Sequence, residues 1–406
     1  MVGAIPPIPR PLDILLYLNN SKNIIFFRYA KTSETKVKWA VNVFEEWRSA
    51  RNRKANQDPT LGISAICPGI PLCQFSKDEL NFAISRFVKE CRNKKGEQYP
   101  GSTLREIVLC LQMNLSQLGF TYRFLNDPIF SQIRNTLDNT MKEIAENGIG
   151  MDTKQAEIIT VEEENRLWES GVLGESTPGQ LVRTVFYLNG IHFALRGGAE
   201  HRKLRLGEHA QIRVIKDSNN AEYLQYTEDT SKTNQGGLSH IKVKRKVVRA
   251  YANTENPERC IVRLHKKYVS LCPSVDNKAF YKQELKSPQS DVWYSKQAKG
   301  IHSLQKMVSE MCKLAGIGGF RTNHSLRATA ASRLYQSGMD EQLIQEVTGH
   351  RSMAVREYKR TNEVQKRSIS SILGGGESEG NKKTCTVSRP TSADGINITL
   401  NVNFSK

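Results

Sequence analysis

The chain has 406 residues, 38% of them hydrophobic, which is enough for two or three domains with apolar cores of their own. Its formal net charge of +18 is spread along the sequence, so we expect a polyanionic partner, with nucleic acid favoured over an anionic membrane. No apolar run of membrane-spanning length and no signal peptide is found, and an intracellular protein with no membrane partner is predicted.

The eight cysteines are scattered and show neither a CxxC motif nor any other paired-ligand spacing. Neither a zinc module nor a disulfide framework is therefore predicted. Cys260, His265 and Cys272 could be imagined as metal ligands, but a fourth ligand is missing, and packing roles in a strand and a helix are the alternative. We expect no metal site.

The first half of the chain divides by its periodicity. Residues 1–30 contain four prolines and predict a flexible arm. In residues 31–146 apolar side chains recur at helical spacing in four segments, which predicts a small all-α domain. Residues 147–159 break the pattern and are interpreted as a linker.

Local signals mark where three of these helices begin. Ser76 with Glu79 and Thr103 with Glu106 have the spacing of capping boxes, and Asp127 before a proline is expected to open the last helix. The polar faces carry many basic side chains. A solvated basic face and a nucleic-acid interface explain them equally well by composition, and the DNA-binding candidates among them are Arg48, Arg51, Lys89 and Arg92.

A second domain is predicted from residue 160 to residue 373. After a capping box at Thr160, an apolar helix that begins at Thr177 leads to Arg196, which is followed by two glycines. An arginine in this context is held on a turn whose backbone can approach a ligand closely, although most arginines in such a context lie on the surface. The composition of residues 374–406 shifts to Ser, Thr, Gly and Lys, which predicts a flexible tail.

Residues 211–250 alternate as three strands and predict a small antiparallel sheet. The polar turn TSKTNQGG places Lys232 at a hairpin tip, and Lys242 on the following strand is the nearest alternative for a functional lysine. The basic run that follows includes the DNA-binding candidates Lys244 and Arg245. It is explained either by strand residues that face DNA or by a nuclear import signal.

The stretch from Thr322 to Arg360 concentrates side chains suited to phosphate chemistry. Asn323 is expected to cap a helix with His324 and Arg327 in its first turn, where backbone donors and the helix dipole favour a phosphate. His350 follows a short helix that ends at a glycine. Tyr358 is expected inside a helix that starts at Ser352 and also carries the DNA-binding candidate Arg356.

The motifs HSLR, GH and REYKR, in this order and spacing, resemble the catalytic core of the tyrosine recombinases. The stretches LNGIHFALRGGAEHRKL, SKTNQGG and NPERCIVRLHKKY resemble the Crypton-type branch, which comprises recombinases of mobile elements and the host proteins derived from them. The resemblance covers roughly residues 160–373 and, more loosely, 31–146. It implies a mainly α protein with a small antiparallel β-sheet, in which a helical core-binding domain clamps DNA against a catalytic domain.

The resemblance also implies a mechanism. Tyr358 would attack the scissile phosphate and form a 3′-phosphotyrosyl link, with Arg196 and Arg327 on the non-bridging oxygens. His324 would accept the tyrosine proton, Lys232 would protonate the leaving 5′ oxygen, and His350 would donate a hydrogen bond to the phosphate. Taken singly, each residue has an ordinary structural alternative, such as capping, ion pairing or core packing.

The expected partner is double-stranded DNA, with no cofactor, in the nucleus, and by family analogy recombination would need a tetramer on two duplexes. The alternative is a catalytically silent, recombinase-derived protein that only binds DNA in regulation. A topoisomerase-like relaxing activity would share the same chemistry.

Overall fold

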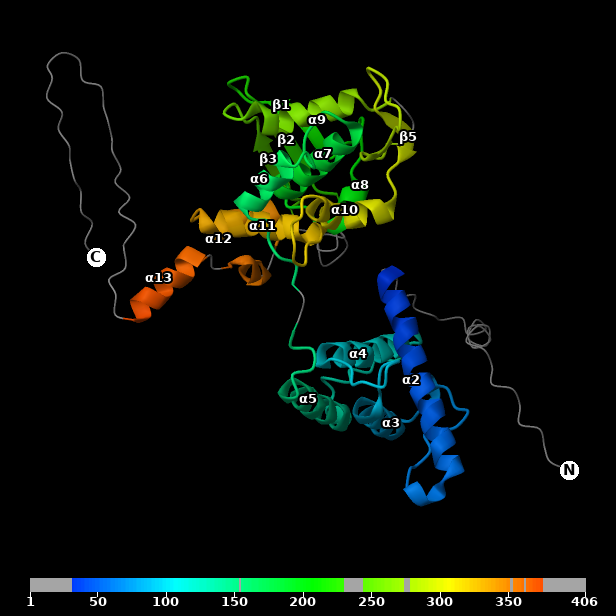
Figure 1. Cartoon of the computed structure of the whole chain (residues 1–406). Helices are drawn as coiled ribbons and strands as arrows, with labels where there is room; N and C mark the ends of the chain where they lie inside the picture. The colour runs from blue at the N-terminus through cyan, green and yellow to red at the C-terminus, as the bar shows by residue number, and fades with distance from the viewer. Residues whose placement is uncertain are drawn as a thin grey trace, which may run out of the picture. The chain divides into compact units, whose positions relative to one another are not determined.

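The structure, a computed structural model, describes residues 31–152, 155–229, 244–273, 278–350, 353–360 and 363–374. The chain divides into two compact units, Met1–Lys154 and Gln155–Lys406, and Figure 1 shows the elements of each. This division falls inside the segment predicted as a linker. The predicted arm, nearly all of the predicted tail and the hairpin tip with Lys232 lie outside the described residues.

The described part of the first unit is entirely helical. Its elements are α2 (Lys31–Gln57), η1 (Pro59–Leu61), η2 (Leu72–Gln74), α3 (Lys77–Glu90), α4 (Gly101–Gln117), η3 (Pro128–Phe130) and α5 (Ser131–Glu146). Their apolar faces share one core, in which Phe44 of α2 packs edge-on against Phe87 of α3 at 5.4 Å between ring centroids. The four predicted amphipathic helices are confirmed.

The predicted helix starts of this unit have different outcomes. The capping box of Ser76 and Glu79 at α3 is confirmed, with both of its hydrogen bonds present. The box predicted at Thr103 is wrong, because α4 begins at Gly101 directly after Pro100 and has no capping side chain. The start at Asp127 is confirmed in position, because Asp127 is the N-cap of η3, which continues directly into α5, although its side chain makes no capping hydrogen bond.

The second unit combines helices with two small antiparallel sheets. Its helices are α6 (Val161–Glu169), α7 (Pro178–His192), α8 (Gly197–Lys203), η5 (Pro257–Arg259), α9 (Ile261–Ser270), α10 (Ile301–Leu314), α11 (Asn323–Gln336), α12 (Glu341–Thr348), η6 (Met353–Tyr358) and α13 (Glu363–Leu373). Its strands are β1 (Ile212–Lys216), β2 (Glu222–Thr227), β3 (Val247–Tyr251), β4 (Lys282–Glu284) and β5 (Tyr294–Ala298). The predicted fold class, mainly α with a small antiparallel sheet, is confirmed.

The larger sheet has the order β1-β2-β3, and one of its faces packs into the core of the unit. Tyr226 on β2 pairs with Val248 on β3, and Leu224 pairs with Ala250, so the side chains of these four residues lie on the same face. All four are buried, and α9 covers them. The alternation that predicted these strands is thus explained by one buried face.

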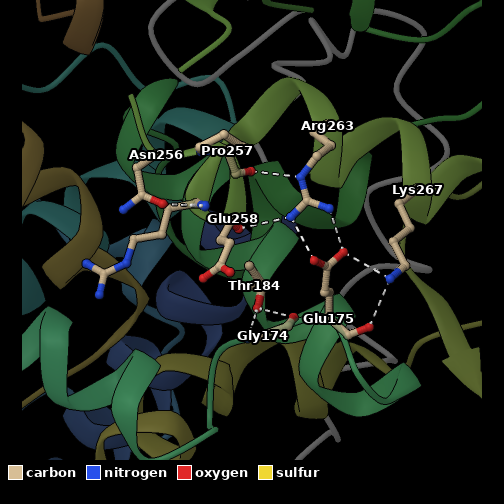
Figure 2. A network of polar contacts seen from close by, with 9 residues as sticks. Gly174, Glu175, Thr184, Asn256, Pro257, Glu258, Arg263 and Lys267 are labelled. Carbon is tan, nitrogen blue, oxygen red and sulfur yellow. Dashed lines mark hydrogen bonds and ion pairs between the residues drawn. The ribbon is translucent and has the colours of Figure 1, made fainter. Parts of the chain in front are cut away.

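A polar network anchors the loop between α6 and α7 to α9 (Figure 2). Both carboxylate oxygens of Glu175 accept hydrogen bonds from the Arg263 guanidinium at 2.8 Å, and Lys267 adds a third at 2.9 Å. Thr184 of α7 closes the loop, because its hydroxyl accepts from the Gly174 amide at 2.7 Å. These contacts hold the start of α7, which the confirmed cap at Thr177 also fixes.

Helices α7 and α11 cross closely at Gly190. A Cβ atom added at Gly190 would lie 2.3 Å from Cδ1 and 3.0 Å from Cβ of Leu326, so only glycine fits this crossing. The crossing brings the end of α7, which leads to Arg196, beside the first turn of α11, which carries Arg327. The fold therefore brings together residues from two segments far apart in the sequence.

Two predicted details of the segment from Thr322 to Arg360 are wrong. Thr322, not Asn323, caps α11, because the Asn323 side chain is buried and donates to the Leu304 carbonyl at 2.7 Å. Tyr358 does not lie inside an α-helix but ends the 3-10 helix η6, and Ser352 lies outside the described residues. Across the described ranges, no helix is both long and apolar enough to cross a membrane.

Candidate active site

Five of the six side chains predicted to act in catalysis lie in one region of the second unit. Arg196 is the N-cap of α8, His324 and Arg327 lie in the first turn of α11, His350 follows the glycine that ends α12, and Tyr358 ends η6. The sixth, Lys232, lies outside the described residues. Direct contacts link four of these residues, and the charge of Arg196 acts to lower the pKa of each of the four, so they form one cluster.

The Tyr358 hydroxyl lies 2.7 Å from Nε2 of His324. The backbone on both sides of this contact is fixed, since the Ser332 hydroxyl donates to the Tyr358 carbonyl at 2.8 Å and Thr322 caps the helix of His324. Burial raises the pKa of Tyr358, and the nearby arginines only partly offset this, so the phenol is protonated at neutral pH. Burial, followed by the charge of Arg327, lowers the pKa of His324, so its imidazole is neutral and can accept a proton.

Arg327 is almost completely buried, with 2% of its surface exposed. Its Nη1 donates to the Ala194 carbonyl at 2.9 Å, and its Nη2 lies 3.4 Å from Nε2 of His350. Its Nε has no hydrogen-bond partner among the described residues. Burial, and next the charge of Arg196, lowers the pKa of Arg327 to about 10, so the guanidinium stays charged at neutral pH.

The turn from Phe193 to Arg196 places the first arginine. Ala194 has φ of 45°, a left-handed conformation that costs a residue with a side chain about 1 kcal/mol or more. The turn is held from both sides, because Arg327 donates to the Ala194 carbonyl and Lys246 donates to the Phe193 carbonyl. The Arg196 amide donates to the Glu200 carboxylate at 2.6 Å, and that carboxylate also lies 4.0 Å from the Arg196 guanidinium.

Lys246 is a member of this cluster that the sequence analysis missed. Its ammonium group lies 5.6 Å from the centroid of the Tyr226 ring. Burial, and after it the charge of Arg327, lowers the pKa of Lys246 to about 7. A sequence signal existed: Val248 and Ala250 are inward residues of β3, so the alternation of the strand extended backwards predicts Lys246 on the same face.

Two of the predicted DNA-binding residues are used inside the first unit. The side chains of Arg48 and Arg51 are only 11% and 10% exposed. Arg48 is paired with Glu45 and donates to the Ile70 carbonyl at 2.6 Å, whereas Arg51 is paired with Glu90. These guanidinium groups already have internal partners, and their role as DNA contacts stays a prediction.

The other predicted DNA-binding residues remain at the surface. Lys89 is 43% exposed and paired with Glu143, and Arg356 is 58% exposed and paired with Glu341. Arg92, Lys244 and Arg245 are exposed, and Arg92 donates to the backbone carbonyls of Lys89 and Cys91.

Nothing in the described ranges resembles a metal site, since no group of three or more His, Cys, Asp and Glu side chains could hold an ion. Two of the three imagined ligands have structural roles. The His265 ring stacks on Phe280 at 5.5 Å between centroids, and the Cys260 sulfur accepts a hydrogen bond from the Asn253 amide.

Two protein families match parts of the chain. The family described as "QRICH1 domain" matches residues 34–144, which lie in the first unit. The family described as "Domain of unknown function (DUF3504)" matches residues 158–313, which include Arg196 but end before His324.

Curated relatives are larger proteins. The transcriptional regulator QRICH1 of Homo sapiens is 26% identical over 288 residues, which cover 67% of this chain and 36% of the relative. Zinc finger MYM-type protein 2 of Homo sapiens is 26% identical over 281 residues, which cover 66% of this chain and 19% of the relative. The chain thus spans about a third or less of the length of these relatives.

Among solved structures, a lambda integrase dimer bound to a COC′ core site matches with a TM-score of 0.44 and 11% identity, covering 86% of this chain and 76% of that one. The XerH site-specific recombinase in a post-cleavage complex matches with a TM-score of 0.38 and 16% identity, covering 73% of this chain and 77% of that one. At these values the matches add nothing to the geometry described above. The chain is therefore characterised by its own cluster: a phenol paired with a neutral imidazole beside two arginines.

Proposed function

We propose that the chain binds double-stranded DNA and cleaves and rejoins its strands through a 3′-phosphotyrosyl intermediate, as the resemblance of its motifs to the tyrosine recombinases implies. The observation that carries this proposal is the 2.7 Å contact between the Tyr358 hydroxyl and Nε2 of His324, next to two electrostatically coupled arginines. A phenol with a raised pKa needs a base at neutral pH, and a histidine with a lowered pKa is present as that base.

In the proposed step, the Tyr358 oxygen forms a bond to phosphorus while the bond from phosphorus to the 5′ oxygen breaks. His324 takes the phenolic proton. Arg196 and Arg327 stabilise the charge on the non-bridging oxygens, and the unpartnered Nε of Arg327 supports this role because it has a proton to donate. The leaving 5′ oxygen needs a proton, and Lys232, carried over from the resemblance, remains the proposed donor.

The step conserves one phosphodiester bond, so a 5′ hydroxyl can reverse it without an energy source. Recombination by this route would join strands of two duplexes, and the tetramer expected by family analogy is part of the proposal. The exposed cations Arg92, Lys244 and Arg245 are proposed to contact the DNA backbone.

A covalent-trapping experiment tests the proposal. Duplexes with randomised sequence and a nick in one strand lose a short fragment after cleavage, so the covalent complex cannot be rejoined and accumulates. We expect wild-type chain to yield DNA that stays bound in denaturing detergent and Tyr358→Phe to yield none. Tight DNA binding by the wild type without any adduct from the whole pool would refute the strand-transfer proposal.

The second candidate is a catalytically silent, nuclear DNA-binding protein with a regulatory role. It is favoured by the name of one set of relatives, the transcriptional regulator QRICH1, although the chain spans only 36% of that protein. This candidate predicts that Tyr358→Phe binds DNA and regulates transcription as the wild type does. The same pair of proteins therefore distinguishes the two functions.

A further inference from the structure

A line of hydrogen bonds runs from the last turn of α12 to Arg327. The Thr348 hydroxyl, which is fully buried, donates to the Ile344 carbonyl at 2.7 Å. The same oxygen lies 2.8 Å from Nδ1 of His350, and the Nε2 atom on the other side of that ring lies 3.4 Å from Nη2 of Arg327. Nδ1 of His350 therefore faces a hydroxyl that also contacts a carbonyl, and Nε2 faces a guanidinium, which can only donate.

These neighbours determine which ring nitrogen of His350 carries the proton. A hydroxyl has one proton, and the 2.7 Å contact of Thr348 with the Ile344 carbonyl favours its donation there, which leaves the oxygen to accept from His350. This requires a proton on Nδ1. On the other side, a guanidinium can only donate, so Nε2 must offer its lone pair to Arg327. The two ends of the ring thus independently require the same tautomer.

We propose that Thr348 and His350 form a positioning pair, in which Thr348 fixes the tautomer of His350 so that Nε2 accepts from Arg327 and holds its guanidinium. This differs from the role expected from the sequence, in which His350 donates to the phosphate, because both ring nitrogens are committed within the protein. The consequence for catalysis rests on the proposed function, but the hydrogen-bond pattern does not.

The burial of the group explains why such a pair is needed. The Nη1 atom of Arg327 donates to the Ala194 carbonyl, and its Nη2 atom has Nε2 of His350 as its acceptor. Removal of His350 would take away this second contact. A guanidinium held at both Nη atoms cannot rotate about its Nε–Cζ bond without breaking one of these contacts. The Nε–H group thereby keeps a fixed direction, which is what a clamp for a phosphate oxygen requires.

The first test measures the tautomer by ¹⁵N NMR of the histidine rings at neutral pH in the full chain without DNA, where His350 is assigned by its loss in His350→Asn. We expect a protonated Nδ1 and an unprotonated Nε2. In Thr348→Val, which keeps the shape but removes the acceptor, the Nε2-protonated form should appear, and the Nη2 signal of Arg327 should show faster rotation. Thr348→Ser should restore the wild-type spectrum.

Thr184→Val is the matched control, because it removes another fully buried threonine hydroxyl, in the network of Figure 2, which also lies within hydrogen-bond distance of the carbonyl four residues earlier. It should leave the His350 spectrum unchanged. An Nε2-protonated His350 in the wild type, or an unchanged tautomer in Thr348→Val, would overturn the proposal. The wild-type measurement decides it even if Thr348→Val does not fold.

The second test uses the covalent-trapping reaction. Loss of one net hydrogen bond predicts cleavage about fivefold slower in Thr348→Val, with DNA affinity unchanged and with recovery in Thr348→Ser. An unchanged rate in a variant whose tautomer has shifted would refute the catalytic consequence. If no chain forms an adduct, the proposed function fails, whereas the NMR measurement still decides whether the positioning pair exists.

Discussion

Replacing His324 by Gln should change both the rate of cleavage by Tyr358 and its dependence on pH. Gln is similar in size and keeps a polar group near the phenol, but it cannot take up a proton. General-base catalysis by a group within hydrogen-bond distance contributes about 100- to 10,000-fold, and the 2.7 Å contact satisfies that distance. Cleavage at neutral pH is therefore expected to fall by at least about 100-fold.

The pH dependence follows from the two pKa shifts. The pKa of His324 lies below its ordinary value of about 6.5, so the base is neutral above that pH and should itself add no pH dependence to the wild-type rate from about pH 7 to pH 9. Without the base, cleavage depends on phenolate. Because the pKa of Tyr358 lies above about 10, the variant rate should rise about tenfold per pH unit across the same range.

The assay is the single-turnover rate of covalent trapping, measured at several pH values with a captured DNA sequence. His302→Gln, on the exposed surface of α10, is the matched control and should behave as the wild type does. Parallel pH profiles for wild type and His324→Gln would show that His324 is not the base. A loss of activity matched by a loss of folded protein would likewise contradict the prediction.

Three further predictions concern the stability and DNA binding of the two units. Gly190→Ala should lower the free energy of unfolding of the second unit by about 1–3 kcal/mol, because the new Cβ atom would overlap α11. Urea unfolding followed by ¹⁹F NMR of labelled tryptophans measures this for each unit separately, because each unit contains two tryptophans. The second unit, which contains all eight histidines, should lose stability before the first as the pH falls from about 6.5 towards 4. His201 and His265 have pKa values of about 3 and about 4, so they are neutral in the folded unit but take up protons when it unfolds. Unfolding of both units at the same pH would refute this prediction. Arg51→Gln should destabilise the first unit without a change in DNA affinity. Arg92→Gln should weaken DNA binding and reduce its salt dependence. Equal effects of the two variants on DNA binding would contradict the different roles given to these arginines.

Signals that depend on a few neighbouring residues predicted the fold well. The capping boxes at Ser76 and Thr160 and the cap at Thr177 are all present, because their hydrogen bonds are made within one helical turn. The cap expected at Thr103 failed because Pro100 starts the helix earlier. Asn323 failed as a cap because its side chain is required by the Leu304 carbonyl, a contact that only the tertiary structure provides.

The sequence predicted which residues make up the candidate site better than it predicted the contacts between them. Motif spacing identified His324 and Tyr358, and the structure places them within a hydrogen bond of each other. The pairing of Arg51 with Glu90 could not be predicted from the sequence, because the two residues lie 39 positions apart. Lys246 was missed because a basic run was read as a surface feature, although one member of it faces inward.

The turn at Ala194 has a consequence for how the cluster behaves when no nucleic acid is bound. Two positive groups, on Arg327 and Lys246, would attract loose anions if they faced only water, yet the peptide oxygens of Ala194 and Phe193 already accept from them. A peptide oxygen carries a partial charge, whereas a counter-ion carries a formal one, so these contacts hold the two cationic side chains in place without neutralising them. In the proposed function, the cluster therefore keeps its positive charge for the phosphate of a duplex, and no bound counter-ion has to leave first.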